Sequence, residues 1–196
     1  MLFLDTEGAF PNAVNERLEH NLKMRKVPSK IVKFISNLLR EQYTTLKFND
    51  YVSDKIALDN RIGQGDPLSM VLYQYYNADI LGIPVNAKES AAAYIDDAIL
   101  VATGKDFNKT HEVLADMMGR TGGAVEWSQN HNSNFEFSKL VLIDFAHRNS
   151  TKTRTNLMLP STTIVPMHST KYLGVYVDQH LAWNTHVAYT IEKGTI

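Results

Sequence analysis

The 196-residue chain contains no cysteine and no long apolar run. The absence of cysteine excludes disulfide frameworks, zinc sites built on Cys ligands and cysteine nucleophiles. No apolar stretch approaches the roughly 20 residues that span a bilayer, and the N-terminus lacks a basic region followed by an apolar one. We therefore expect an intracellular protein, nuclear or cytoplasmic, that is not secreted and has no membrane partner.

Net charge is also nearly absent. Twenty Lys and Arg stand against 21 Asp and Glu, a formal net charge of −1, so the chain lacks the basic excess of a self-sufficient nucleic-acid binder. The charge is uneven, however, because only Glu19 and Glu41 are acidic between Arg17 and Lys47. This basic segment is either a positive face that can approach a phosphate backbone or a solvated helix face.

The apolar pattern predicts both helices and strands within one domain. With 44% apolar and 21% charged residues the chain can bury an ordinary core, and no repeat or linker divides it. Helical spacing predicts helices from Asn12, from Pro28, from Pro67 to about Ile80 and from about Phe107. Strand-like runs cover residues 2–4, 44–58 with a turn at Asn49-Asp50, 91–102, 139–145 and 170–178. We expect an α+β fold with an antiparallel sheet.

Asp96 and Asp97 form an acidic pair between two apolar runs, at the bend of the second predicted hairpin. Unpaired charge is costly in an apolar setting, and a divalent cation would relieve it. Asp5 follows the apolar run of residues 2–4 in the same manner, so a sheet could bring it beside the pair. Oxygen ligands suit Mg²⁺ or Mn²⁺. The alternative for Asp96-Asp97 is an ordinary turn.

Five segments, in this order, resemble motifs A to E of reverse transcriptases, and the style is that of non-LTR, LINE-like retrotransposons. The segments are Phe3–Phe10, Gly63–Ser69, Tyr94–Asp97, Phe135–Phe145 and Lys171–Val175. The resemblance implies an RNA-directed DNA polymerase with a palm-like antiparallel sheet and packed helices. It covers most of the chain, so residues 1–196 are expected to be a partial reverse transcriptase domain, the palm.

The resemblance implies two-metal nucleotidyl transfer, with Mg²⁺, or Mn²⁺ in its place, stabilising the attacking and leaving oxygens. Asp5 and Asp96 would bridge both ions, and Asp97 would be the third acid. Lys139 would protonate or neutralise the pyrophosphate; the alternative is an exposed strand-end lysine.

The same resemblance implies residues that bind the substrates. Phe10 would be the steric gate against a 2′-hydroxyl, or else a core residue. Gln64 and Gly65 would lie against the incoming nucleotide, with Ser69 near the start of the supporting helix. A primer grip would comprise Lys171, Tyr172, Leu173 and Gly174, for which the alternative is a plain strand and turn.

The chain also departs from the family pattern. Met70 stands where Pro is usual, and Ile95 fills the variable place of the Tyr-x-Asp-Asp box. The fingers and a full thumb are expected to be largely absent, so RNA template, DNA primer and deoxynucleoside triphosphates would bind through a parent enzyme. The competing hypotheses are an inert retroelement remnant or repurposed interaction module, and an unrelated Mg²⁺-dependent phosphohydrolase.

Overall fold

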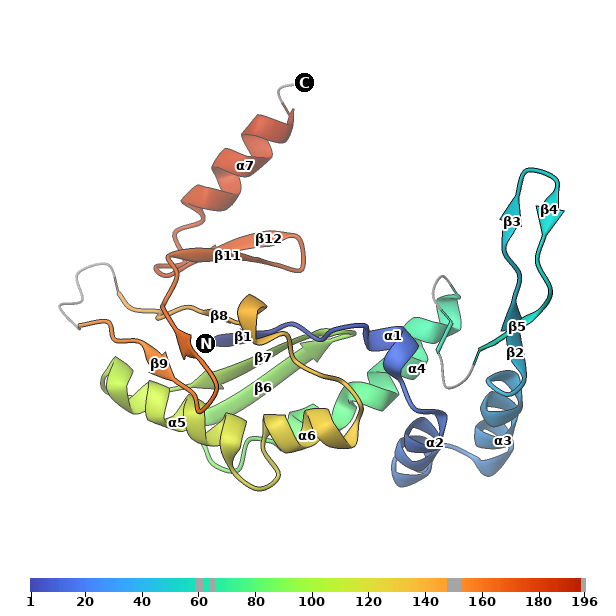
Figure 1. The fold of residues 1–196 in the computed structure, drawn as a ribbon. Helices are drawn as coiled ribbons and strands as arrows, with labels where there is room; N and C mark the ends of the chain where they lie inside the picture. The colour runs from blue at the N-terminus through green and yellow to red at the C-terminus, as the bar shows by residue number, and fades with distance from the viewer. Residues whose placement is uncertain (59–61, 64–65, 148–152, 195–196) are drawn as a thin grey trace.

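A four-stranded antiparallel sheet in the order β6-β7-β1-β8 is the centre of the fold (Figure 1). The protein was analysed as a computed structural model that describes residues 1–58, 62–63, 66–147 and 153–194. The strands are β1 (Leu2–Leu4), β6 (Glu89–Tyr94), β7 (Asp97–Ala102) and β8 (Val141–Leu142). The predicted α+β class with antiparallel pairing is confirmed.

The two faces of the sheet have different neighbours. Leu2 pairs with Leu100, and both side chains belong to the larger hydrophobic core. Phe3 points to the opposite face because side chains alternate along a strand, and its ring meets that of Tyr172 at 5.4 Å. The second face is therefore available for a separate hairpin and for the polar residues that follow β1.

Helices α5 (Phe107–Gly119) and α6 (Ala124–Asn130) cover the core face of the sheet. The side chain of Asp106 caps α5 by accepting a hydrogen bond from the Lys109 amide at 2.9 Å. Gly123 joins the helices closely, since a Cβ there would lie 2.7 Å from the carbonyl oxygens of Met117 and Arg120. The Gly122-Gly123 segment thus allows α6 to fold back over the core.

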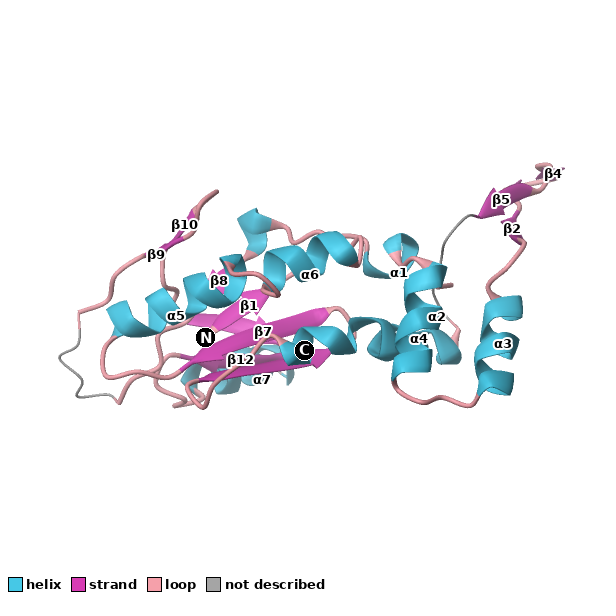
Figure 2. Cartoon of the chain, turned by 90° about the horizontal axis from the view of Figure 1, so that it is seen from below, coloured by secondary structure: helices cyan, strands magenta, loops and turns pink. Residues whose placement is uncertain are grey.

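A second hydrophobic cluster lies at one end of the sheet, where Figure 2 shows α2, α3 and α4 together. The helices of this region are α1 (Ala9–Asn12), α2 (Asn15–Met24), α3 (Ser29–Leu38), α4 (Pro67–Asn77) and the 3₁₀ helix η1 (Ala78–Gly82). Helix α4 begins as expected, with Pro67 in its first turn and the Asp66 carboxylate accepting from the Leu68 amide at 2.8 Å.

Polar contacts join this cluster to the larger core. Asp79 accepts from Arg17 at 3.4 Å and from Arg25 at 2.7 Å, and it lies 3.3 Å from Nε2 of buried His131. The Tyr76 hydroxyl donates to the His131 carbonyl. These contacts tie α2 and α4 to the segment that follows α6.

The remaining strands form two-stranded units outside the main sheet. The predicted hairpin of residues 44–58 is present as β2 (Gln42–Thr44), β3 (Lys47–Phe48), β4 (Tyr51–Val52) and β5 (Ile56–Leu58). Two further pairs are β9 (Leu157–Met158) with β10 (Thr163–Ile164), and β11 (Ser169–Tyr172) with β12 (Val175–Asp178). Helix α7 (Asn184–Gly194) ends the described chain.

Two predicted strands differ in the structure. The strand expected over 139–145 is reduced to Val141–Leu142, which pairs with Phe3 and Leu2 of β1, and Lys139 ends the short 3₁₀ helix η2 (Phe137–Lys139). The run 170–178 is a hairpin, since Leu173 (φ 47°) and Gly174 (φ 82°) form a turn that reverses the chain. Helices α6 and α7 were not predicted.

One buried ion pair connects β6 to the end of α5. The Arg120 guanidinium donates to the two Glu89 carboxylate oxygens at 2.6 and 3.1 Å, and the Glu89 side chain is only 3% exposed. Arg120 also donates to exposed Asp116 at 2.8 Å. The Arg120 hydrogen bonds, and to a smaller extent those from Val85 and Asn86, lower the pKa of Glu89 to about 2.

We predict that Arg120→Met lowers the free energy of unfolding at pH 7 by about 3–5 kcal/mol, because it leaves Glu89 buried and unpaired. Asp116→Asn, which removes only the exposed partner, should cost less than about 1 kcal/mol. The Glu89 contribution is present above its ordinary pKa of 4.5 and is lost as the pH falls towards about 2. Urea unfolding at several pH values measures this; equal losses in the two variants would contradict the prediction.

Candidate active site

The pairing of β1 with β7 places Asp5 beside Asp97. Leu4 pairs with Ala98 in antiparallel register, so the next residues at that end of the two strands are Asp5 and Asp97. Leu4 and Ala98 face the larger core, and the alternation of side chains directs the two acids to the other face. Asp96 is in the turn between β6 and β7. The three acids predicted from the sequence therefore lie at one end of the sheet.

Partial burial and repulsion from neighbouring carboxylates both contribute to the raised pKa of Asp97. Partial burial raises the pKa of Asp97 above its ordinary value, and the charges of Asp96 and then Asp5 raise it further. The strand register, which brings Asp5 and Asp96 next to Asp97, is the geometric reason for this repulsion. This end of the sheet therefore concentrates negative charge that a cation would stabilise.

The turn that carries Asp96 is held in a strained conformation. Ile95 has a φ of 56°, in the left-handed region that β-branched residues seldom adopt. Its carbonyl oxygen accepts a hydrogen bond of 2.5 Å from Nδ2 of Asn77, which is the last residue of α4. Asn77 thus fixes the turn from a distant helix. No local pattern in the sequence pointed to this residue.

Lys139 lies at the site, although not in a strand. Its Nζ is 3.4 Å from Oδ2 of Asp5 and also pairs with the Glu136 carboxylate. The Glu136 amide donates to the Asp5 carbonyl at 3.1 Å, so the segment before η2 is attached to the residue after β1. Glu136, and to a smaller extent Asp5, raise the pKa of Lys139. The ammonium is held in its charged form.

Phe10 is half-buried and packs on Tyr73 of α4, with ring centroids 4.9 Å apart. Burial chiefly, and also the charges of Tyr76 and Asp96, raise the pKa of Tyr73. Ser69 is buried in the first turn of α4. Gln64 and Gly65, the residues predicted to contact the nucleotide, lie outside the described residues.

The β11–β12 hairpin reaches the acids from the other side. Burial, and then the charge of Asp97, raise the pKa of Tyr172, whose ring packs on Phe3 of β1. Leu173 and Gly174 form the tip of this hairpin, and Lys171 extends towards the Tyr189 ring of α7, 5.4 Å away. Of the four residues predicted as a primer grip, Tyr172 contacts β1, the strand that leads to Asp5, through the ring of Phe3.

The donor chemistry of this site fits a hard divalent cation, since Asp5, Asp96 and Asp97 supply carboxylate oxygens whose repulsion a cation would relieve. Within the described parts of the chain, no three His, Cys, Asp or Glu side chains stand together in a geometry that holds one ion. Asp5 is instead oriented towards Lys139. A metal bound here would therefore require Asp5 to exchange its ammonium partner for the ion.

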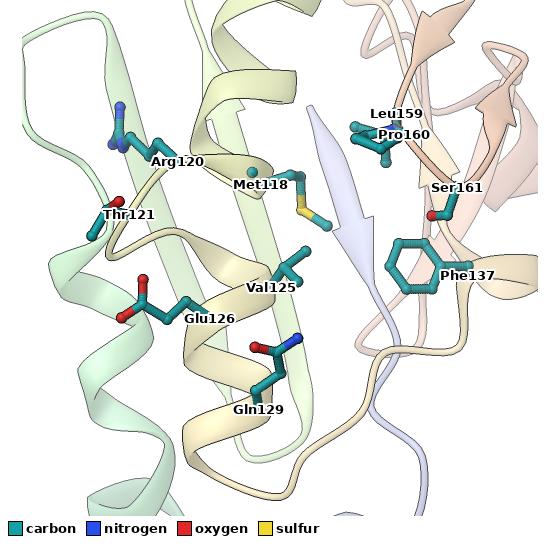
Figure 3. A pocket seen from close by; sticks show the side chains of 11 residues that line it. Met118, Arg120, Thr121, Val125, Glu126, Gln129, Phe137, Leu159, Pro160 and Ser161 are labelled. Atoms are coloured by element: carbon teal, nitrogen blue, oxygen red, sulfur yellow. The ribbon is translucent and has the colours of Figure 1, made fainter.

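A cavity of about 700 Å³ lies away from the acids, between α5, α6 and the turn that joins β9 to β10 (Figure 3). Met118, Val125, Phe137 and Leu159 give it an apolar lining. The Arg120 guanidinium at its rim is occupied by Glu89. This cavity has none of the convergent acids of the sheet end and is not part of the candidate active site.

The family model described as reverse transcriptase (RNA-dependent DNA polymerase) matches residues 1–177. The chain is 23% identical over 190 residues to the RNA-directed DNA polymerase from mobile element jockey of Drosophila melanogaster, covering 94% of this chain and 20% of that protein. It is 22% identical over 188 residues to the probable RNA-directed DNA polymerase from transposon X-element of the same organism, covering 95% and 20%. The chain thus spans about one fifth of the length of these relatives. No described helix is long and apolar enough to cross a membrane.

We predict that Asp97→Asn raises the free energy of unfolding at pH 7 by a few tenths of a kcal/mol, because it removes a repelled charge that is only partly buried. The folded-state pKa of Asp97 is raised, so the penalty is absent below the ordinary pKa of 3.8 and develops as the pH rises through the folded value. The gain should therefore disappear in acid. Asp54→Asn, at an exposed hairpin position, is the control and should change stability at neither pH; a loss of stability in Asp97→Asn would show that the carboxylates do not repel.

Proposed function

Because the chain belongs to the reverse transcriptase family, we propose that residues 1–196 are a partial reverse transcriptase domain, the palm, of a longer RNA-directed DNA polymerase. The parent enzyme would be encoded by a non-LTR, LINE-like retrotransposon and would act in the nucleus or the cytoplasm. The observation that supports the proposal is the position of Asp5, Asp96 and Asp97 at one end of a four-stranded antiparallel sheet. Family membership argues against an unrelated phosphohydrolase.

Asp5, Asp96 and Asp97 would hold two Mg²⁺ ions, or Mn²⁺ in their place, through their carboxylate oxygens. Bound there, the ions would stabilise the charge of the attacking 3′-oxygen of the primer and of the leaving pyrophosphate. The strained turn held by Asn77 supports this role, since it keeps two carboxylates at the strand ends, where no described residue forms an ion pair with either of them.

Lys139 would neutralise the pyrophosphate. The raised pKa favours charge neutralisation over proton donation, because an ammonium that is held more tightly is a weaker acid. Lys139 lies within reach of Asp5, the same acid that would bind the metal ions. Lys139 would be available to an anionic pyrophosphate if Asp5 held a metal ion in its place.

Phe10 would exclude a ribose 2′-hydroxyl, and packing on buried Tyr73 would hold its ring in place for this role. Gln64, Gly65 and Ser69 would support the incoming deoxynucleotide at the start of α4. The Lys171–Gly174 turn region would hold the primer end, with Tyr172 against β1. RNA template and DNA primer would bind through the parent enzyme, because a chain with a net charge of −1 has weak affinity for nucleic acid by itself.

We predict that the isolated chain extends a DNA primer on an RNA template poorly or not at all, because positioning of the substrates is a large part of phosphoryl-transfer catalysis. A chimera in which residues 1–196 replace the matching fifth of the jockey polymerase should incorporate deoxynucleotides with Mg²⁺. Asp96→Asn in the chimera should reduce incorporation about 1,000-fold, since several kcal/mol of transition-state stabilisation are lost.

Asp54→Asn in the same chimera is the matched control, because this acid lies on an exposed hairpin, and it should leave incorporation unchanged. A folded but silent chimera would favour the competing hypothesis of an inert remnant or a repurposed interaction module. Robust extension by the isolated chain would show that the segments outside residues 1–196 are not needed.

A further inference from the structure

Helix α3 is apolar over a wider arc than the fold covers. Its inner side chains, Val32, Ile35 and the adjoining Leu39, are buried in the second hydrophobic cluster. A second stripe at the same helical spacing, Ile31, Phe34 and Leu38, is 49%, 62% and 43% exposed. A helix of a folded protein normally buries such a stripe. The uncovered half of this arc is therefore a candidate interface.

A row of basic residues lies beside the exposed apolar stripe of α3, on the side away from the buried residues. Lys30, Lys33 and Arg40 follow one another at helical spacing on α3 and just beyond its end. Six Lys and Arg and no acidic residue occur between Glu19 and Glu41. Lys30 and Lys33 are exposed and form no ion pair with any residue that the structure describes.

A depression of about 360 Å³ between α2 and α3 continues this basic side. Lys23, Lys33 and Arg40 line it, together with Glu19, which pairs with Lys23 at 2.6 Å and accepts from Ser36 at 2.6 Å. The cations outnumber the one acid, so an acidic side chain of a partner could enter. The surface made by Ile31, Phe34 and Leu38 with Lys30, Lys33 and Arg40 is called the α3 surface below.

We propose that the α3 surface binds an amphipathic helix with acidic residues beside its apolar stripe, contributed by the part of the parent polymerase outside residues 1–196. This rests on the proposed function, and on the relatives being about five times as long as the matching region. Helices with apolar stripes pack ridges into grooves, and carboxylates of the partner would lie along Lys30 and Lys33.

Two other occupants fit the surface less well. A second copy of the chain would bring its own Lys30 and Lys33 against the same lysines in a symmetric dimer, where like charges repel. A single-stranded nucleic acid would satisfy the cations but needs several aromatic rings for stacking, and the α3 surface offers one ring, that of Phe34. The charge and the shape of the stripe together favour an acidic helix.

The test is binding of a designed 18-residue helical peptide, with a Leu stripe flanked by Glu, to the intact 196-residue chain at low salt. Phe34→Ser and the double variant Lys30→Glu/Lys33→Glu should each weaken binding at least 10-fold. Met158→Ser and the double variant Lys88→Glu/Lys105→Glu change equally exposed residues elsewhere and should leave binding unchanged. Circular dichroism establishes that each variant is folded.

The second probe set consists of overlapping 20-residue peptides from the jockey polymerase. They are taken from the parts of that protein outside the fifth that matches this chain. At least one acidic amphipathic peptide should bind the wild-type chain and not Phe34→Ser. Three results would each overturn the proposal. The first is that neither peptide set binds. The others are tighter binding of a single-stranded RNA with the same dependence on Lys30 and Lys33, and a dimer that Phe34→Ser abolishes.

The assay contains no metal, nucleotide or template, so it separates this proposal from the proposed function. The Asp96→Asn chain should bind the designed peptide as the wild-type chain does. An active chimera with no peptide binding would remove the α3 surface proposal alone. Peptide binding with an inactive chimera would leave the surface intact and remove the polymerase proposal.

Discussion

The antiparallel pairing of β1 with β7 is the contact on which the candidate active site depends. Leu2 and Leu4 of β1 are buried against the helices that cover the core face, and this burial sets which residues of β7 they oppose. A shift of one residue would turn Leu2 and Leu4 away from the core and would separate Asp5 from Asp97. The apolar face of the sheet therefore determines where the carboxylates meet.

The site combines features that oppose folding. The charges of Asp5, Asp96 and Asp97 repel one another, and Ile95 occupies a left-handed conformation. Asn77 holds the turn through one hydrogen bond, and Lys139 partly neutralises Asp5. Charge repulsion and backbone strain of this kind are expected at a site that binds a charged ligand. Charge balance at the site thus depends on side chains from three separate segments.

The sequence predicted best those features that depend on neighbouring residues. The bend at Asp96-Asp97, the turn at Asn49-Asp50 and the start of α4 at Pro67 each follow from local patterns, and the structure contains them. The contact of Asn77 with Ile95 joins residues 18 apart and has no local signal.

Features that depend on distant partners were also missed. Strand β8 pairs with β1, more than 130 positions earlier in the chain, and the strand predicted over 139–145 was too long. Helix α6 was not predicted because seven residues after Gly123 give little periodicity. The placement of Lys139 beside Asp5 rests on Glu136, whose amide binds the Asp5 carbonyl, and no spacing in the sequence indicated that contact.

The most direct test of the metal site is broadening of backbone amide NMR signals by Mn²⁺ in the isolated chain, since a paramagnetic ion affects only nearby nuclei. We predict selective broadening at Asp5, Asp96 and Asp97 at Mn²⁺ concentrations on the order of millimolar, because ions without a bound triphosphate keep several waters. The broadening should be absent in the Asp96→Asn/Asp97→Asn double variant and unchanged in Asp54→Asn. Broadening that persists in the double variant would place the metal elsewhere and contradict the account.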